Sequence, residues 1–292
     1  MKELKIGYLS DTHLDFYVSQ KDPNRMKQPI KNYIEKLLQP EKADVLIIAG
    51  DMTHYNMQLF ELVDQLRSSY DKFLIVEGNH DRYLVSNNVR DKYKKSSQAR
   101  IDEVINEYKD DNDVYFLAGD VVDIKGVKFG GYGNWYNLDT DGKIASWNDI
   151  MYDSNLIMEG AEPNRFTYGY GGSHKASQWD TQAFRLENEK MLENIIKEQC
   201  NILVTHIVPA VIPDEHLYSG HVGDGNNLFY MTDDIEEVQK TGADIVIYGH
   251  NHTCIEFDLE GIEFKTNALG YPNELTGFDG INHFTYFTKD SN

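Results

Sequence analysis

Five short apolar runs of the sequence each end at side chains that can bind a metal ion. The first run is followed by an Asp-x-His motif, the second by Gly-Asp, the third by Gly-Asn-His-Asp, the fourth by a single His and the fifth by Gly-His-Asn-His. Imidazole nitrogen with carboxylate or amide oxygen is a ligand set that suits first-row transition metals. The candidate metal ligands are, in chain order, Asp11, His13, Asp51, Asn79, His206, His250 and His252.

The runs that precede these motifs have the composition of strands buried on both faces of a sheet, because they are rich in Ile, Val and Leu. Stretches with helical spacing of apolar residues separate them, for example at 30–38 and 59–66. Alternating strands and helices predict an α/β sheet whose parallel strands end at one shared edge. We therefore expect the candidate ligands to converge there. The predicted strands lie at residues 4–10, 44–50, 72–78, 201–205 and 244–249.

Other parts of the sequence predict antiparallel pairing. Runs at 114–117, 121–124 and 127–131 are typical of a meander. Those at 254–259 and 262–266 are typical of a hairpin, because a Glu-Gly turn joins them. These pieces indicate either a second sheet or extensions of the first.

Two long stretches of the chain lack clear periodicity. Residues 132–181 contain all three tryptophans, and 209–230 is a second irregular stretch with several glycines. Irregular segments of this length in a compact domain are often functional. The aromatic side chains of 132–181 could form a cap over the metal site, or they could pack as a small core of their own. His216 and His221 could face a substrate or lie in solvent.

The five motifs occur in a specific order: D-x-H, G-D, G-N-H-D, H and G-H-x-H. This order resembles the calcineurin-like metallophosphoesterase superfamily, and the resemblance extends from Asp11 to His252 without a missing position. It implies an α/β fold of four layers, an αββα sandwich in which helices flank two mixed β-sheets. We expect one such domain over residues 1–292, with a two-metal centre at the strand ends.

The resemblance also implies how the candidate ligands are divided between two metal ions. Asp51 would bridge both ions, since a carboxylate has two oxygens to offer. One ion would be held by Asp11, His13 and His252, and the other by Asn79, His206 and His250.

A catalytic histidine is implied at His80, with Asp81 as its orienting partner. His54, three residues after Asp51, could lie near the site as a hydrogen-bond donor or a substrate contact, or at the solvated start of the next helix. Arg82 is the nearest basic residue to the motifs and could contact a phosphate oxygen or pair with an acidic residue.

The chemistry of phosphate esters gives a physical reason for such a site. The ester is an anion that repels hydroxide, and two cations about 3.5–4 Å apart can bind it and also hold a bridging hydroxide at neutral pH. The mixed nitrogen and oxygen ligands suit Mn, Fe, Zn or Co better than Ca²⁺ or Cu⁺. His80 would protonate the leaving group. The sequence thus predicts a hydrolase acting on phosphoric ester bonds.

The charge of the chain limits the substrate class. There are 28 basic and 48 acidic residues, which gives a net charge of −20, and such a chain repels nucleic acids and anionic membranes. We therefore favour a small phosphomonoester or phosphodiester, such as a nucleotide. A Mn-dependent nuclease of the same superfamily is the alternative, because a histidine follows the Gly-Asp-Met-Thr stretch. A scaffold without catalysis is a weaker alternative.

The cellular setting is predicted from what the sequence contains. Cys200 and Cys254 form no disulfide framework, so we expect two reduced thiols. There is no apolar run of about 18 residues and no signal-peptide pattern near the first residue. We therefore expect a cytoplasmic protein with no membrane span. The oligomeric state is not predicted.

Overall fold

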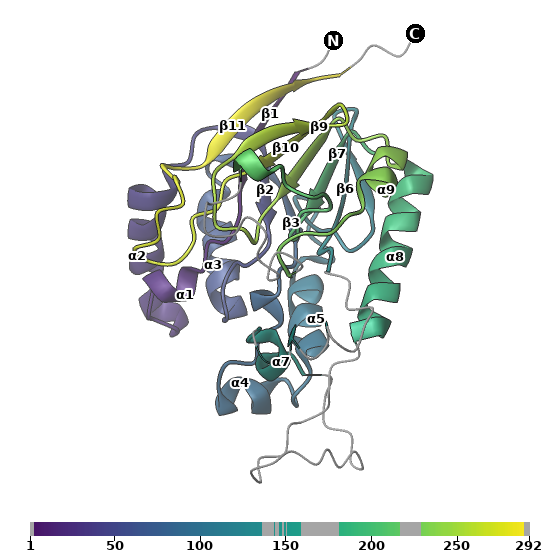
Figure 1. Cartoon of the computed structure of the whole chain (residues 1–292). Coiled ribbons are helices and arrows are strands. Elements are labelled where there is room, and N and C mark those ends of the chain that lie inside the picture. Colours follow the sequence, from purple (N-terminus) through teal and green to yellow (C-terminus); the bar gives the residue numbers. More distant parts are fainter. Residues whose placement is uncertain are drawn as a thin grey trace.

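Two β-sheets face each other between two layers of helices (Figure 1). The apolar runs of the sequence form the central strands, and the amphipathic stretches form the helices that cover them. This four-layer αββα sandwich confirms the predicted fold class. The computed structural model describes residues 3–135, 143, 146, 147, 149, 151–158, 181–216 and 229–288.

The first sheet has the strand order β11-β1-β2-β3-β4. Strands β1 to β4 are parallel, whereas β11 pairs antiparallel with β1, which places Leu4 opposite Tyr286. Most residues of β2 and β3 are buried, as continuous apolar runs predict. The strands are β1 (Glu3–Leu9), β2 (Ala43–Ala49), β3 (Tyr70–Val76), β4 (Val114–Phe116) and β11 (Asn282–Phe287).

The second sheet has the strand order β5-β6-β7-β8-β10-β9. Strands β6, β7, β8 and β10 are parallel, and the antiparallel strands β5 and β9 form its two edges. The sheet is therefore mixed, like the first one. The strands are β5 (Val121–Ile124), β6 (Val127–Tyr132), β7 (Ile202–Thr205), β8 (Ile245–Tyr248), β9 (Glu256–Leu259) and β10 (Ile262–Thr266).

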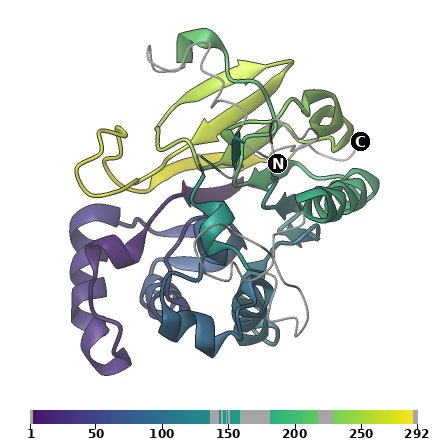
Figure 2. The ribbon, with the colours of Figure 1, turned by 60° about the horizontal axis from the view of Figure 1, so that its bottom comes forward.

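Helices cover the outer face of each sheet. Apolar side chains of α2, α3 and α5 pack on the first sheet, and those of α8 and α9 pack on the second. Figure 2 shows purple α2 and green α8 on opposite sides of the sheets. The α-helices are α1 (Leu14–Tyr17), α2 (Pro23–Tyr33), α3 (Asn56–Leu66), α4 (Asn87–Lys92), α5 (Ser97–Tyr108), α7 (Asp153–Leu156), α8 (Thr181–Glu198) and α9 (Ile235–Lys240).

Short turns of other helix types extend or separate these elements. The π-helical turn η1 continues α2, and the 3₁₀ turn η2 follows β3 at the Gly-Asn-His-Asp motif. The side chain of Asp22 accepts a hydrogen bond from the backbone N–H of Asn24 and so caps the start of α2. The turns are η1 (Ile34–Leu38), η2 (His80–Arg82) and η3 (Asp214–His216).

The main apolar core lies between the two sheets. Val45, Ile47 and Val76 of the first sheet pack in one cluster with Phe129 and Val204 of the second. These side chains are almost fully buried. Since apolar burial stabilises by about 25 cal/mol per Å², this cluster fixes the two sheets against each other and so fixes the positions of their strand ends.

The structure differs from the strand prediction in two details. The run at 114–117 is not part of a meander, because β4 pairs in parallel with β3 in the first sheet, and only β5 and β6 form a hairpin. The hairpin of β9 and β10 is confirmed. Strand β11 was not predicted, since all but one of its residues are half-buried or exposed and its apolar pattern is weak.

The two irregular stretches are described in part. Trp179 and His221 lie outside the described residues. The described residues of 132–181 contribute to a small core beside the strand ends, as one of the two interpretations of that segment predicted. The members of this core are Tyr83, Trp135, Trp147, Met151, Ile157, Ile207 and Phe229.

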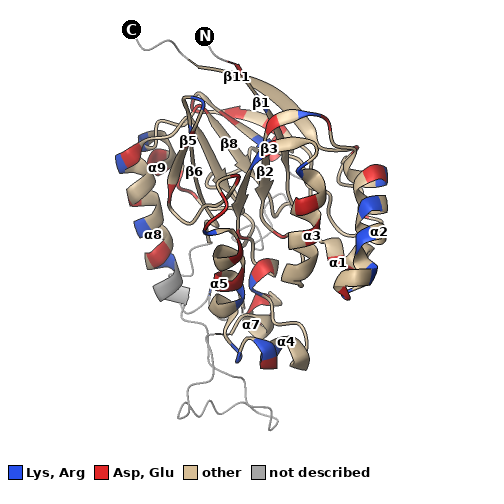
Figure 3. Ribbon diagram, turned by 180° about the vertical axis from the view of Figure 1, so that it is seen from behind, with Lys and Arg blue, Asp and Glu red and all other residues tan. Residues whose placement is uncertain are grey.

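Acidic and basic residues are interspersed along α8, whereas α3 carries only acidic ones (Figure 3). The net charge of the chain is −20, so acidic residues dominate the surface overall. Within the described part of the chain, no helix has the length and apolar character needed to cross a bilayer.

The two thiols should be unreactive in the folded protein. Cys200 is buried, and burial raises the pKa of its thiol to about 11. Burial also raises the pKa of half-buried Cys254 to about 11. At pH 8 only about one thiol in a thousand would be a thiolate. We expect slow labelling by a chromogenic disulfide reagent at pH 8 and fast labelling of both thiols in guanidinium; fast native labelling would contradict this expectation.

Candidate metal centre

The carboxyl ends of five strands from both sheets meet at one place. Strands β1, β2 and β3 of the first sheet lead to the Asp-x-His, Gly-Asp and Gly-Asn-His-Asp motifs. Strands β7 and β8 of the second sheet lead to His206 and to the Gly-His-Asn-His motif. The structure brings all seven predicted ligand side chains together there, in two groups that share Asp51.

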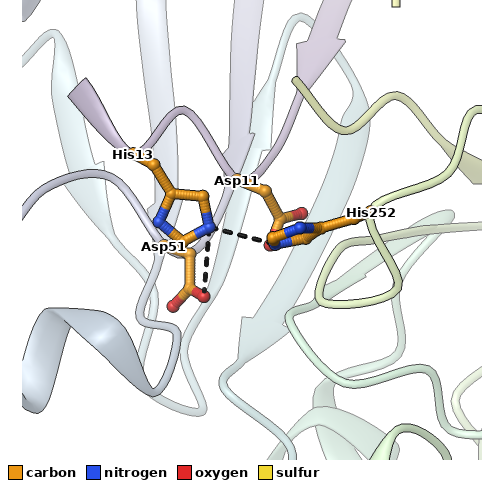
Figure 4. Close-up of side chains that lie close together, drawn as sticks. All are labelled: Asp11, His13, Asp51 and His252. Atoms are coloured by element: carbon orange, nitrogen blue, oxygen red, sulfur yellow. Dashed lines mark hydrogen bonds and ion pairs between the residues drawn. The ribbon is translucent and has the colours of Figure 1, made fainter. Parts of the chain in front are cut away.

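The first group consists of Asp11, His13, Asp51 and His252 (Figure 4). One ligand atom from each lies within 4.8 Å of the others. The Nε2 atoms of His13 and His252 are 3.0 Å apart. Oδ1 of Asp11 is 3.4 Å from Nε2 of His252, and Oδ2 of Asp51 is 3.9 Å from Nε2 of His13. Two nitrogens and two carboxylates therefore face one small volume.

The second group lies on the other side of Asp51. Its ligand atoms come from Asp51, His206 and His250 and also lie within 4.8 Å of one another. Nε2 of His206 is 3.4 Å from Oδ1 of Asp51 and 3.2 Å from Oδ1 of Asn79. Since the other Asp51 oxygen faces His13, each oxygen of this carboxylate is directed to one group.

The outer ring nitrogens of three histidines indicate that the inner nitrogens could bind a cation. Nδ1 of His206 donates to the Ala49 carbonyl at 2.9 Å, and Nε2 of His250 donates to the Phe229 carbonyl at 3.0 Å. Nδ1 of His252 donates to Glu274 at 2.6 Å. Because a carbonyl or carboxylate oxygen can only accept, the outer nitrogen carries the proton. In the neutral ring the inner nitrogen then offers a lone pair, as a metal ligand must.

The backbone around the site is strained. Five of the seven candidate ligands have positive φ angles, a region that L-residues other than glycine rarely adopt. Such conformations cost about 1–3 kcal/mol each and are usually found at functional sites. A Cβ atom at Gly78 would collide with the Asp51 side chain, which explains the glycine there. The five residues are Asp11, His13, Asp51, His250 and His252.

His80 belongs to a chain of hydrogen bonds beside the two groups. Its Nδ1 lies 3.0 Å from Nε2 of His54, whose Nδ1 lies 2.8 Å from the carboxylate of Asp15. On the other side of the ring, the hydroxyl of Tyr271 lies 3.0 Å from Nε2 of His80. Since Asp15 only accepts, His54 donates to it from Nδ1, and His80 donates to His54. His54, predicted near the site, therefore contacts His80.

The prediction that Asp81 orients His80 is wrong. Its carboxylate accepts hydrogen bonds from the backbone N–H groups of Asp51, Met52 and Gly78 at 2.8–3.0 Å. The 3₁₀ turn directs the Asp81 side chain back to the strand ends, away from the ring of the preceding residue. Asp81 thus connects the loop after β2 with the loop after β3.

The structure also does not place Arg82 at a phosphate. Its guanidinium is buried and binds Glu77 at 2.7 Å and Gln98 at 3.1 Å. Arg82 does not line the cavity described below. Burying a guanidinium requires a charged partner, and Glu77 provides it, so the alternative of an acidic partner for Arg82 is the one observed.

Several residues at the site were not predicted. Arg100 of α5 is 1% exposed and donates to the backbone carbonyls of Thr53, His80 and Tyr83, which holds the His54 and His80 loops together. The amide Nδ2 of Asn79 donates to Asp153 at 2.8 Å. Asp153 is fully buried, and because its carboxylate only accepts, it turns Oδ1 of Asn79 toward His206.

A cavity of about 760 Å³ opens at this site. Asp51, Asn79, His80 and His250 form part of its wall, together with Tyr271. Met151 and Tyr152 from the 132–181 segment and His216 from the 209–230 segment also line it. Both irregular stretches therefore reach the site through their described residues.

A family model described as calcineurin-like phosphoesterase matches residues 4–254, which include all the motifs above. The chain belongs to this family. As a calcineurin-like phosphoesterase it is a hydrolase that acts on phosphoester bonds, and its Asp and His groups are candidate metal ligands.

Three proteins resemble this calcineurin-like phosphoesterase over most of its length at low sequence identity. An uncharacterized protein of Acanthamoeba polyphaga mimivirus is 22% identical, covering 98% of this chain and 96% of the viral protein. The crystal structure of phosphopantetheinyl hydrolase from Mycobacterium tuberculosis is 17% identical, covers 93% of both chains and has a TM-score of 0.61. A dimetal phosphatase from Danio rerio is 12% identical, covering 98% of this chain and 93% of that chain, with a TM-score of 0.42. The mycobacterial structure shows the same fold.

Metal affinity should rise with pH. Burial alone would lower the pKa of His206, but the charge of Asp51 outweighs it and raises that pKa to about 9. Burial alone would also lower the pKa of His252, but hydrogen bonds to Asp11 and Glu274 outweigh this effect and raise that pKa to about 10. Without metal both rings are protonated at pH 7, so a cation must displace protons, and its affinity increases about tenfold per pH unit for each proton.

Titration calorimetry with Mn²⁺ at pH 6.5 and 8.5 tests this expectation. Repeating each titration in buffers of different ionisation enthalpy counts the protons released. Equal affinities at both pH values with no proton release would contradict the prediction.

Replacing Asp153 should weaken metal binding. In Asp153→Asn the new amide can donate as well as accept, so the Asn79 amide is no longer forced into one orientation. We expect a 10- to 100-fold loss of affinity for one ion, as for other residues that orient metal ligands, measured by calorimetry and by metal content after dialysis. Asn155→Ala, an exposed position of the same helix, is the control and should bind like the wild type. Wild-type affinity in Asp153→Asn would refute this role.

Proposed function

We propose that this chain hydrolyses a small phosphomonoester or phosphodiester with a centre of two metal ions. One observation carries the proposal: the two oxygens of the buried Asp51 carboxylate face two separate groups of candidate ligands. A single carboxylate placed between two ligand groups is what a bridged ion pair requires. The family match and the cavity beside Asp51 support the same conclusion.

In this proposal the candidate ligands would divide between two ions in the way that the family resemblance implied. When bound, the two cations would neutralise the charge of the phosphate and activate water for attack. Their nitrogen and oxygen ligands favour Mn, Fe, Zn or Co. Asp11, His13 and His252 would hold one ion, and Asn79, His206 and His250 the other, with Asp51 shared.

His80 would donate the proton to the leaving-group oxygen. It lines the cavity, and its Nδ1 is held by His54 while its Nε2 lies on the side of Tyr271. Burial lowers the pKa of His80, and the carboxylate of Asp15 at the end of this chain would oppose that shift by stabilising the imidazolium form through His54. His54 and Asp15 are positioning residues in this scheme, because they act through His80.

We also propose that the enzyme acts in a reducing compartment such as the cytoplasm. The two cysteines are free, and neither is needed for the fold as a disulfide. Immunolocalisation in the source cell would test this.

Replacing His80 separates catalysis from metal binding. We expect His80→Ala to lower the rate by about 10²- to 10⁴-fold on an ester with a poor leaving group, because general acid catalysis contributes this much, while both ions stay bound. Asp51→Asn should lose metal as well as activity. Activity is measured with Mn²⁺, and metal content by mass spectrometry. The control is His283→Ala on β11, away from the site. Full activity of His80→Ala would remove the role proposed for His80.

A substrate panel tests the substrate class. The panel pairs an aryl phosphate with an aryl phosphodiester and adds cyclic nucleotides, a phosphopantetheinyl ester and single-stranded oligonucleotides. We expect turnover of small esters and none of oligonucleotides. Turnover of oligonucleotides alone would favour the nuclease alternative, and no turnover of any compound with Mn²⁺, Fe²⁺, Zn²⁺ or Co²⁺ would refute the proposal.

A further inference from the structure

Beyond the candidate ligands, much of the cavity wall consists of apolar and aromatic side chains. We call six of these the apolar collar. They come from the 132–181 segment, from the chain around 209–231 and from the loop after β10, so three separate parts of the sequence supply them. The apolar collar consists of Met151, Tyr152, Ile212, Tyr230, Met231 and Leu275.

Several collar side chains are more exposed than large apolar residues usually are. Leu275 is 92% exposed, Tyr152 is 76% exposed and Tyr230 is 37% exposed. Exposed apolar side chains are common singly, but a group of them around one opening indicates a binding surface. Here the opening is that of the candidate metal centre.

The aromatic part of the wall begins directly at the candidate ligands. The ring of Tyr230 stacks on His250 with centroids 5.0 Å apart, and the ring of Tyr271 stacks on His13 at 4.3 Å. A group attached to a phosphorus atom at the ions would therefore meet these rings and then the apolar collar. Aromatic faces favour flat or apolar groups at such positions.

The described cavity wall carries no lysine or arginine. Its carboxylates are Asp51 at the candidate metal site and Glu274, which is bound to His252. A second anionic group on the substrate, away from the ions, would find no lysine or arginine among the described lining residues, and His216 is the one histidine there that is neither a candidate ligand nor His80. The net charge of −20 would repel that group.

We propose that the apolar collar binds the organic group of the substrate, and that this group is uncharged and apolar or aromatic. The collar then selects esters with one phosphate and no other anionic group. This inference rests on the proposed function, because it assumes that the phosphate binds at the metal centre.

Phosphonates test the inference without turnover, since their C–P bond is not an ester. Titration calorimetry of the Mn²⁺-loaded enzyme would compare methylphosphonate, phenylphosphonate and 4-carboxyphenylphosphonate. We expect phenylphosphonate to bind at least about tenfold more tightly than methylphosphonate, because its ring leaves water for an apolar wall. The added carboxylate of the third compound should remove that advantage.

A change of charge at the collar gives a second measurement. Leu275→Arg should fold normally, since Leu275 is exposed, and should bind 4-carboxyphenylphosphonate several-fold more tightly than the wild type does. Leu275→Gln is the matched control, because it replaces an apolar side chain with a polar one without adding charge. It should weaken phenylphosphonate binding and leave 4-carboxyphenylphosphonate unimproved.

The outcomes separate this inference from the proposed function. Equal binding of methyl- and phenylphosphonate, or tighter binding of the carboxylated compound by the wild type, would overturn the role of the collar while leaving the metal centre in place. If no phosphonate binds and no metal is retained, the proposed function itself is refuted, and not only the role of the collar.

Discussion

The buried charge of Asp11 and Asp51 is the constraint on which the rest of the site depends. These carboxylates are 0% and 1% exposed, and a buried carboxylate is costly unless it is paired. In the described structure their neighbours are histidines, the Ser10 hydroxyl and backbone N–H groups rather than lysine or arginine. Two cations between them would complete the pairing.

Both sheets are needed to build this arrangement. The first sheet supplies Asp11, His13, Asp51 and Asn79, and the second supplies the other histidines. The apolar cluster between the sheets fixes their strand ends relative to each other. Hydrogen bonds then adjust single side chains, as when the Ala49 carbonyl of β2 accepts from His206 after β7. The core between the sheets sets the positions of the strand ends, and these local contacts set the orientation of the side chains.

The candidate ligands could be predicted from the sequence because each follows a strand directly, so their convergence depends only on strand order. The partner of His80 could not be predicted, since a 3₁₀ turn directs Asp81 away from His80 and the contact between His80 and His54 joins two separate loops. The role of Asp153 could not be predicted either, because Asp153 lies in an irregular segment, 74 positions away from Asn79 in the sequence. The place of β4 was missed for a similar reason: parallel pairing across α5 leaves no local pattern.

The shared position of Asp51 has a consequence for how the protein holds together. One carboxylate oxygen faces ligands after β1 and after β8, and the other faces a histidine after β7. Ions bound there would act as cross-links between the two halves of the sandwich, as a disulfide does in a secreted protein. The cell's supply of transition metal would then govern the lifetime of the folded chain as well as its turnover of substrate.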